Sequence, residues 1–137
     1  MMKKHFSYVS LRAQYQNDSG DLFCSDQRFD PGFQAYRKQF HMPDPIILPG
    51  GTKALVDPGY AGVTEYVVNC IVVLRGAHGF KKFRLWGHNE CAACGGVTDP
   101  AFYEAMLRKG GAILSAAIPN LEVELHFADF DGFYQIV

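Results

Sequence analysis

Three side chains that bind metals or carry redox chemistry lie close together in the stretch WGHNECAACGG, at residues 86–96. They are His88, Cys91 and Cys94. Their spacing is compatible with three interpretations: His88 and Cys91 form half of a zinc site, Cys91 and Cys94 form a redox pair of the CxxC type, or the thiols are buried core residues. Residues elsewhere in the chain distinguish among these interpretations.

Another cysteine, Cys24, opens the run CSDQR far upstream. Zinc binds thiolate sulfur and imidazole nitrogen, and a site with three protein ligands leaves a fourth position for water or substrate. Cys24, His88 and Cys91 form such a set. In an extended conformation Cys24, Asp26 and Arg28 project to the same side, so that Arg28 pairs with the Asp26 carboxylate. Paired in this way, Asp26 accepts a hydrogen bond from zinc-bound water; released, it coordinates zinc itself and closes the site.

Short apolar runs predict the β-strands that must position these ligands. They are DLFC at 21–24, DPIIL at 44–48, KKFRLW at 81–86, and two runs around a DFDG turn within 121–137. The first run ends at Cys24, and the third delivers His88 at its C-terminal end. In open α/β sheets the functional crevice lies outside the carboxyl ends of the strands, where both residues would then lie.

Helices are expected between the strands. Apolar residues recur at a spacing of three and four within 56–79, which is the pattern of one helix face, and Gly76 is placed to end this helix. The face consists of Val63, Tyr66, Val67, Cys70, Ile71 and Leu74. A second helix is expected over 98–119, where Gly110 and Gly111 weaken the middle, so that two shorter helices are the alternative.

Strands that alternate with helices predict an α/β fold with a mostly parallel central sheet flanked by helices, and they allow an antiparallel edge. A chain of 137 residues has the length of one ordinary domain, so residues 1–137 are expected to form a single domain. A hydrophobic share of 48% with 20% charged residues is typical of a soluble globular protein and argues against disorder.

Charge and hydropathy exclude several partners. The formal net charge of -1 provides no basic surface for a phosphate backbone, which argues against nucleic acid. Apolar runs such as VVNCIVVL are much shorter than the roughly 20 residues of a membrane span, and the N-terminus has no apolar core of signal-peptide type. We therefore expect no membrane contact and a cytoplasmic protein, in which clustered cysteines do metal or redox work.

The combined pattern resembles that of the β-class carbonic anhydrases. Their signature joins a CxDxR run to a later GHxxC run, matched here at 24–28 and 87–91. The order of segments is similar too: DPIILPGG at 44–51 stands where the family has a strand that ends in a glycine turn, and GVTEYVVNCIVVL at 62–74 stands where it has the helix before the histidine strand. The resemblance covers residues 20–137.

The resemblance implies a zinc enzyme that reversibly hydrates carbon dioxide to bicarbonate. Zinc on Cys24, His88 and Cys91 would lower the pKa of a bound water, and the resulting hydroxide would attack carbon dioxide. Asp26 would orient the water and Arg28 would hold Asp26. Because two thiolates neutralise Zn²⁺, this water should be less acidic than in a three-histidine site, where its pKa is about 7, and activity should rise toward alkaline pH. A homodimer or higher homo-oligomer is also implied.

Two differences from the family keep other functions open. Residues 48 and 49 are Leu-Pro where the family has Arg-Asn, and Ala92 and Ala93 separate Cys91 from the glycines that normally follow it. One alternative is a thiol redox protein that uses Cys91 and Cys94, with a thiolate stabilised by a helix N-terminus. The other is a zinc-binding protein of the same fold that catalyses no reaction.

Overall fold

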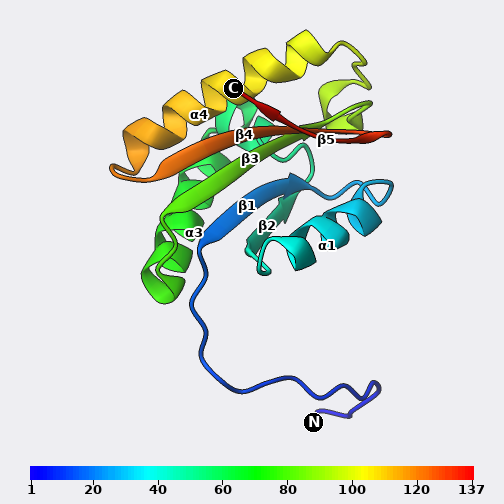
Figure 1. Cartoon of the computed structure of the whole chain (residues 1–137), viewed down its shortest axis with the longest axis vertical. Coiled ribbons are helices and arrows are strands. Elements are labelled where there is room, and N and C mark those ends of the chain that lie inside the picture. The colour runs from blue at the N-terminus through cyan, green and yellow to red at the C-terminus, as the bar shows by residue number, and fades with distance from the viewer.

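The computed structural model describes residues 1–137 except the side chain of residue 61. Its centre is a sheet of five strands in the order β2-β1-β3-β4-β5 (Figure 1). The strands are β1 (Ser19–Cys24), β2 (Asp44–Leu48), β3 (Lys82–His88), β4 (Glu122–Asp129) and β5 (Gly132–Ile136). Neighbouring strands are parallel except β4 and β5, which pair antiparallel. The predicted α/β fold, with a mostly parallel sheet and an antiparallel edge, is confirmed.

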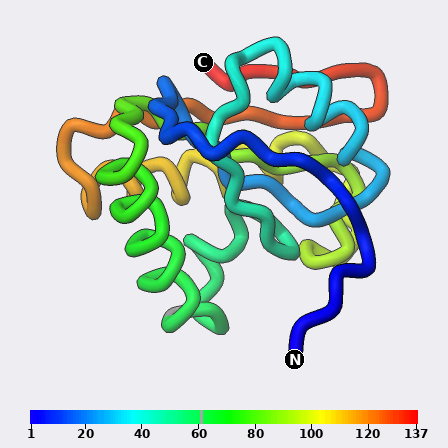
Figure 2. The backbone as a smooth tube through the Cα atoms, turned by 90° about the horizontal axis from the view of Figure 1, so that it is seen from below, coloured from blue at the N-terminus to red at the C-terminus, as the bar shows by residue number. Residues whose placement is uncertain are grey.

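Helices cover both faces of the sheet. They are α1 (Asp30–Gln39), α2 (Lys53–Val56), α3 (Ala61–His78) and α4 (Pro100–Ala117), with 3₁₀ turns η1 (Pro58–Tyr60) and η2 (Ala92–Cys94). Figure 2 shows α1 and α3 on opposite sides of the strands, and Figure 1 shows the N-terminal segment running away from the sheet. Among the described residues, every helix is too short or too polar to cross a membrane.

Alternation along the central strands gives the sheet two buried faces, as a parallel sheet requires. Leu22 and Leu85 are fully buried in a core that α2, α3 and α4 complete. Phe23 and Trp86 point to the other face, where Phe33 of α1 stacks on Phe23 with ring centroids 3.9 Å apart. The central strands are therefore held from both sides, which fixes the positions of their C-terminal ends.

Helix α3 ends later than predicted, and less of its predicted apolar face is buried. Gly76 does not end the helix; it continues to His78, and Gly79 ends it with a left-handed φ of 76°. A residue without a side chain adopts that conformation easily, which is why the stop falls at Gly79. Val67 and Ile71 of the predicted apolar face are buried, but Tyr66 is 68% exposed. Only the later part of that face packs on the core.

The glycine pair in α4 serves packing and does not interrupt the helix. Helix α4 is continuous from Pro100 to Ala117, so the alternative of two shorter helices is wrong. A Cβ at Gly110 would lie 2.6 Å from Cγ2 of Thr52, and one at Gly111 would lie 3.1 Å from Cδ2 of Leu125. Thr52 is fully buried and donates a hydrogen bond from Oγ1 to the carbonyl oxygen of Trp86 at 2.9 Å. The pair therefore lets α4 approach the start of α2 and the sheet.

Two glycine-to-alanine variants in long helices should change stability in opposite directions. Gly110→Ala should lower the free energy of unfolding by about 1–3 kcal/mol, because its methyl group collides with the fixed Thr52 side chain. Gly76→Ala in α3 has no heavy atom within 4 Å of its new methyl group and should raise it by up to about 1 kcal/mol. Urea unfolding followed by circular dichroism measures both. Equal changes in the two variants would contradict this account of the glycine pair.

Charged side chains are buried under α1. Trp86 Nε1 donates to Asp21 Oδ1 at 2.9 Å, and Arg84 Nη1 donates to Ser19 Oγ at 2.8 Å and lies 3.7 Å from Asp21 Oδ1. Asp21 Oδ2 is buried without a partner in the described part of the chain. Burial raises the pKa of Asp21 to about 6, against the opposing hydrogen bond from Trp86 and the charge of Arg84. The ionised carboxylate is thus a stability cost at neutral pH.

This cost should appear as a pH-dependent difference between wild type and Asp21→Asn. A carboxyl group whose pKa is raised from 3.8 to about 6 contributes stability below the lower value, which is lost as pH rises through the higher one. The free energy of unfolding of Asp21→Asn minus that of wild type should therefore increase by up to about 3 kcal/mol between pH 4 and pH 7.5. Urea unfolding at both pH values measures it, with the exposed Asp18→Asn as control. A difference that is the same at both pH values would refute the assignment.

Candidate metal centre

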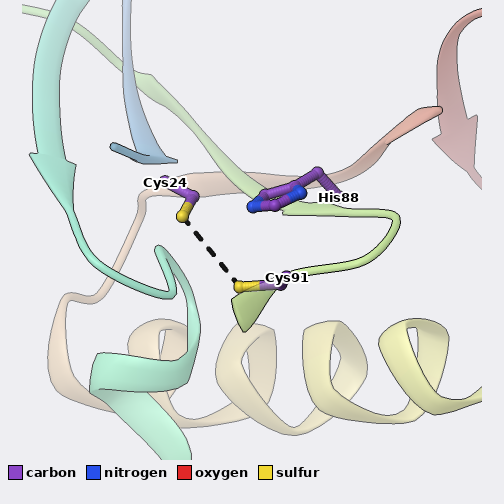
Figure 3. Close-up of side chains that lie close together, drawn as sticks. All are labelled: Cys24, His88 and Cys91. Carbon is purple, nitrogen blue, oxygen red and sulfur yellow. Dashed lines mark hydrogen bonds between the residues drawn. The ribbon is translucent and has the colours of Figure 1, made fainter. Parts of the chain in front are cut away.

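Cys24, His88 and Cys91 meet at the C-terminal edge of the central strands. Cys24 is the last residue of β1 and His88 the last of β3, and these strands are parallel neighbours. One ligand atom from each of the three residues lies within 4.8 Å of the other two. Figure 3 shows the sulfur atoms of Cys24 and Cys91 directed toward each other with the imidazole of His88 beside them.

The separation of the donors suits a tetrahedral ion. Cys24 Sγ and Cys91 Sγ are 4.0 Å apart. Two sulfurs that each lie about 2.3 Å from a tetrahedral zinc ion are about 3.8 Å apart. All three side chains are buried, Cys24 at 8% exposure and the others less, so the donors are held in a largely dry environment.

The orientation of His88 leaves one nitrogen free for a metal. Nδ1 lies 2.8 Å from the carbonyl oxygen of Asn89, which requires that Nδ1 carries the proton and donates it. Nε2 is then an unprotonated donor atom, and it is buried without a hydrogen-bond partner among the described residues. Buried polar atoms are normally satisfied, so this orphan atom between two thiols fits a bound cation. The donor set of two sulfurs and one imidazole nitrogen is one that zinc prefers.

Backbone groups fix the two cysteines. The N–H of Gly50, in the glycine turn after β2, donates to Cys24 Sγ at 3.2 Å. Gly51 packs so closely that a Cβ there would lie 3.1 Å from the backbone nitrogen of Cys24. On the other side, the buried hydroxyl of Tyr103 accepts from the N–H of Cys91 at 3.2 Å and donates to the carbonyl oxygen of Val97 at 2.6 Å. The loop that carries Cys91 is thereby tied to α4.

The thiols are protonated when no metal is bound. The hydrogen bond with the Cys91 thiol, followed by burial, raises the pKa of Cys24 to about 12. A cation that binds here must therefore displace a proton from Cys24, because only the thiolate is a metal ligand.

Asp26 and Arg28 form a tight pair beside the ligands, but not on an extended strand as predicted. β1 ends at Cys24, and the following residues form a turn in which the N–H of Arg28 donates to Asp26 Oδ1 at 2.9 Å. The turn brings the guanidinium back onto the carboxylate, with Nη2 2.7 Å from Asp26 Oδ2. These hydrogen bonds lower the pKa of Asp26 to about 2, so the group is an ionised acceptor. Its Oδ2 lies 4.0 Å from His88 Nε2.

Glu90 is a residue of the site that the sequence analysis missed. Its Oε2 accepts from Arg28 Nη1 at 2.8 Å and its carbonyl oxygen accepts from Arg28 Nη2 at 3.0 Å. Glu90 lies inside the GHNEC run, but nothing in the spacing of that run assigns a partner to it. Gly50 and Tyr103 were missed for a similar reason, since both act on ligands that are distant in the sequence.

Cys94 lies outside the group of three ligands. Residues Ala92–Cys94 form a single 3₁₀ turn, which Gly95 and Gly96 end at φ 77° and 71°. The helix at Cys91 and Cys94 is therefore a single 3₁₀ turn with Cys91 as its N-cap residue, and the redox use of these two thiols stays a prediction. The two glycines turn the chain away before a longer helix can form.

A cavity of about 210 Å³ opens beside the cluster. Cys24, Ser25 and Asp26 line it on one side, and Pro49, Gly50, Ala92 and Ala93 line it on the other. Polar groups are thus gathered near the ligands, while the remaining wall is mostly small and apolar. The arrangement suits a small molecule that reaches the fourth position of a metal on Cys24, His88 and Cys91.

Comparison of the sequence with protein-family models and with curated proteins finds no match. Solved structures do match. A carbonic anhydrase from Streptococcus mutans has a TM-score of 0.67 over 96% of this chain and 88% of its own, at 17% identity. The β-carbonic anhydrase isoform I of Trichomonas vaginalis has a TM-score of 0.62 over 96% of this chain and 88% of its own, at 14% identity. A carbonic anhydrase from Glaciozyma antarctica has a TM-score of 0.61 over 93% of this chain and 86% of its own, at 16% identity. The chain has the β-carbonic anhydrase fold.

Metal analysis of purified variants tests the ligand set. We expect about one zinc per chain in wild type and a loss of nearly all of it in Cys24→Ser, His88→Ala and Cys91→Ser, because each removes one of three protein donors. Cys94→Ser is the matched control and should keep its zinc. Mass spectrometry of the metal content after dialysis measures the occupancy. Zinc lost from Cys94→Ser as well would contradict the three-ligand set.

Proposed function

We propose that this protein is a zinc-dependent enzyme that reversibly hydrates carbon dioxide to bicarbonate, and that Cys24, His88 and Cys91 hold the metal. The observation that carries the proposal is the cluster of two thiols and an unsatisfied imidazole nitrogen, with an ionised carboxylate 4.0 Å from that nitrogen. Zinc, when bound, would act as a Lewis acid and lower the pKa of a bound water molecule. The β-carbonic anhydrase fold supports the same reaction.

Asp26 is proposed to orient the attacking water. Its low pKa keeps it ionised across the neutral range, so it accepts a hydrogen bond from the water and leaves an oxygen lone pair free to face the substrate. Arg28 holds Asp26 through both Nε and Nη2, which prevents the carboxylate from rotating. Neither residue needs to change its protonation state near neutral pH.

The cavity supports a small uncharged substrate. Pro49, Ala92 and Ala93 offer carbon surface, and no lysine or arginine is among the residues that line the cavity in the described structure. Carbon dioxide is linear and uncharged, so it loses little hydration when it enters such a space. The Leu-Pro at residues 48 and 49, which replaces a cationic position, fits this uncharged character.

We also propose that the protein works as a homo-oligomer in the cytoplasm. Apolar side chains are exposed along α3, among them Val63 at 39%, Tyr66 at 68% and Val73 at 68%. Burial of such a patch against a second copy would remove apolar surface from water. The free thiols of Cys24 and the other cysteines suit a reducing compartment.

Stopped-flow measurement of carbon dioxide hydration by the zinc-loaded protein tests the proposal. The rate should exceed that of buffer and rise from neutral to alkaline pH, because two thiolate ligands leave the bound water weakly acidic. Asp26→Ala and Arg28→Ala should lower it by roughly tenfold to a hundredfold, since the water loses its orientation.

The matched control is Glu104→Ala, which removes an exposed carboxylate that pairs with Arg108 on α4. It should leave the rate unchanged. A zinc-loaded protein without hydration above buffer at any pH would refute the enzyme activity and leave a zinc-binding protein of this fold.

A further inference from the structure

Arg28 connects the two loops that carry the ligands. From the loop after β1, Asp26 binds its Nε and Nη2; from the loop after β3, Glu90 binds its Nη1 through Oε2 and its Nη2 through the backbone carbonyl oxygen. One N–H of Nε, one of Nη1 and both of Nη2 are engaged, which is four of the five N–H groups of a guanidinium. The cation is therefore held from both sides.

Glu90 occupies a position that disfavours its residue type. Its φ of 56° lies in the left-handed region, a backbone conformation that glycine and asparagine adopt more easily than glutamate does. A side chain retained at such a position needs a compensating role. The hydrogen bond at 2.8 Å to Arg28 is the contact that this side chain makes.

The Asp26 carboxylate lies close enough to the proposed metal position to bind the metal in place of Arg28. Its Oδ2 is 4.0 Å from His88 Nε2, the buried nitrogen that has no hydrogen-bond partner among the described residues. Carboxylate oxygen is a zinc ligand, so an Asp26 released from Arg28 would compete for the position that the water needs. Two donor atoms that each lie about 2.0 Å from a tetrahedral zinc ion are about 3.3 Å apart, so Oδ2 would have to approach Nε2 by less than about 1 Å.

We propose that Glu90 is a positioning residue that keeps the metal site open. By holding Arg28 in place, it retains Asp26 on the guanidinium and away from the metal. This inference rests on the proposed function, because it takes Cys24, His88 and Cys91 as the metal ligands. Glu90 itself contacts neither the metal ligands' donor atoms nor the water.

The test is an azide titration of the full-length protein loaded with Co²⁺, whose visible absorption reports the ligands of the metal. Azide binds the open position, so an Asp26 that has moved onto the metal must be displaced first. Glu90→Ala should raise the Kd of azide about fivefold, the upper range for an exposed charge pair. Electrostatics alone predicts the opposite result, because removal of a nearby negative charge would lower the Kd of an anion such as azide.

A double-mutant cycle identifies the route of the effect. In an Asp26→Asn background, Glu90→Ala should leave the Kd of azide unchanged or slightly lower it, because the competing carboxylate is gone and only the electrostatic effect remains. Glu90→Gly should raise the Kd as Glu90→Ala does while the melting temperature stays level or rises, because glycine relieves the left-handed backbone. The matched control is Glu104→Ala, whose carboxylate lies 2.7 Å from Arg108 at a similar exposure of 48%.

The outcomes separate this inference from the proposed function. Equal or tighter azide binding by Glu90→Ala overturns the role of Glu90 alone. A rise in Kd that persists in the Asp26→Asn background also overturns it. A wild-type protein that takes up no Co²⁺ overturns both proposals, whereas the expected azide response without carbon dioxide hydration supports the role of Glu90 and overturns only the proposed reaction.

Discussion

Strands β1 and β3 lie side by side and run in the same direction, so their last residues, Cys24 and His88, meet at one edge of the sheet. An antiparallel pairing would place them at opposite edges, and no loop rearrangement would reunite them. The register is enforced from both faces: Leu22 and Leu85 are fully buried on one side, and Phe23 and Trp86 on the other. A slip by one residue would turn each of these side chains to the wrong face.

The ligands are positioned by a chain of contacts that begins far from them. Gly110 of α4 allows Thr52 to lie against the helix, and Thr52 is bonded to the carbonyl oxygen of Trp86 in β3. This anchors the turn in which Gly50 donates its N–H to Cys24 Sγ. On the opposite side, Tyr103 of the same helix bonds the backbone of Cys91. Helix α4 therefore supports both thiols, and its packing on the sheet is part of the site's geometry.

Much of this site was predictable because its donors lie at strand ends and within short motifs. The runs around Cys24 and His88 specify both the ligand types and their place at the carboxyl edge. The pairing of Asp26 with Arg28 was expected from an extended strand, yet it arises from a turn, because local side-chain hydrogen bonds compete with strand geometry. The partner role of Glu90 was not predictable, since it depends on a left-handed φ and on a contact with a residue 62 positions away.

The charge around the cavity favours a neutral molecule over an anion. Two thiolates would balance a divalent ion, and the single charge of Arg28 is shared by Asp26 and Glu90, which leaves one net negative charge in this group. Lys53, the first residue of α2, is engaged by the carbonyl oxygen of Ala93 and by Asp57. A cation in the turn would add a charge-assisted hydrogen bond of about 1.5–3 kcal/mol to a bound anion, which corresponds to roughly tenfold to a hundredfold in affinity. Leu-Pro supplies no such cation, so under the proposed reaction a bicarbonate anion would be held weakly, whereas uncharged carbon dioxide would lose no such bond.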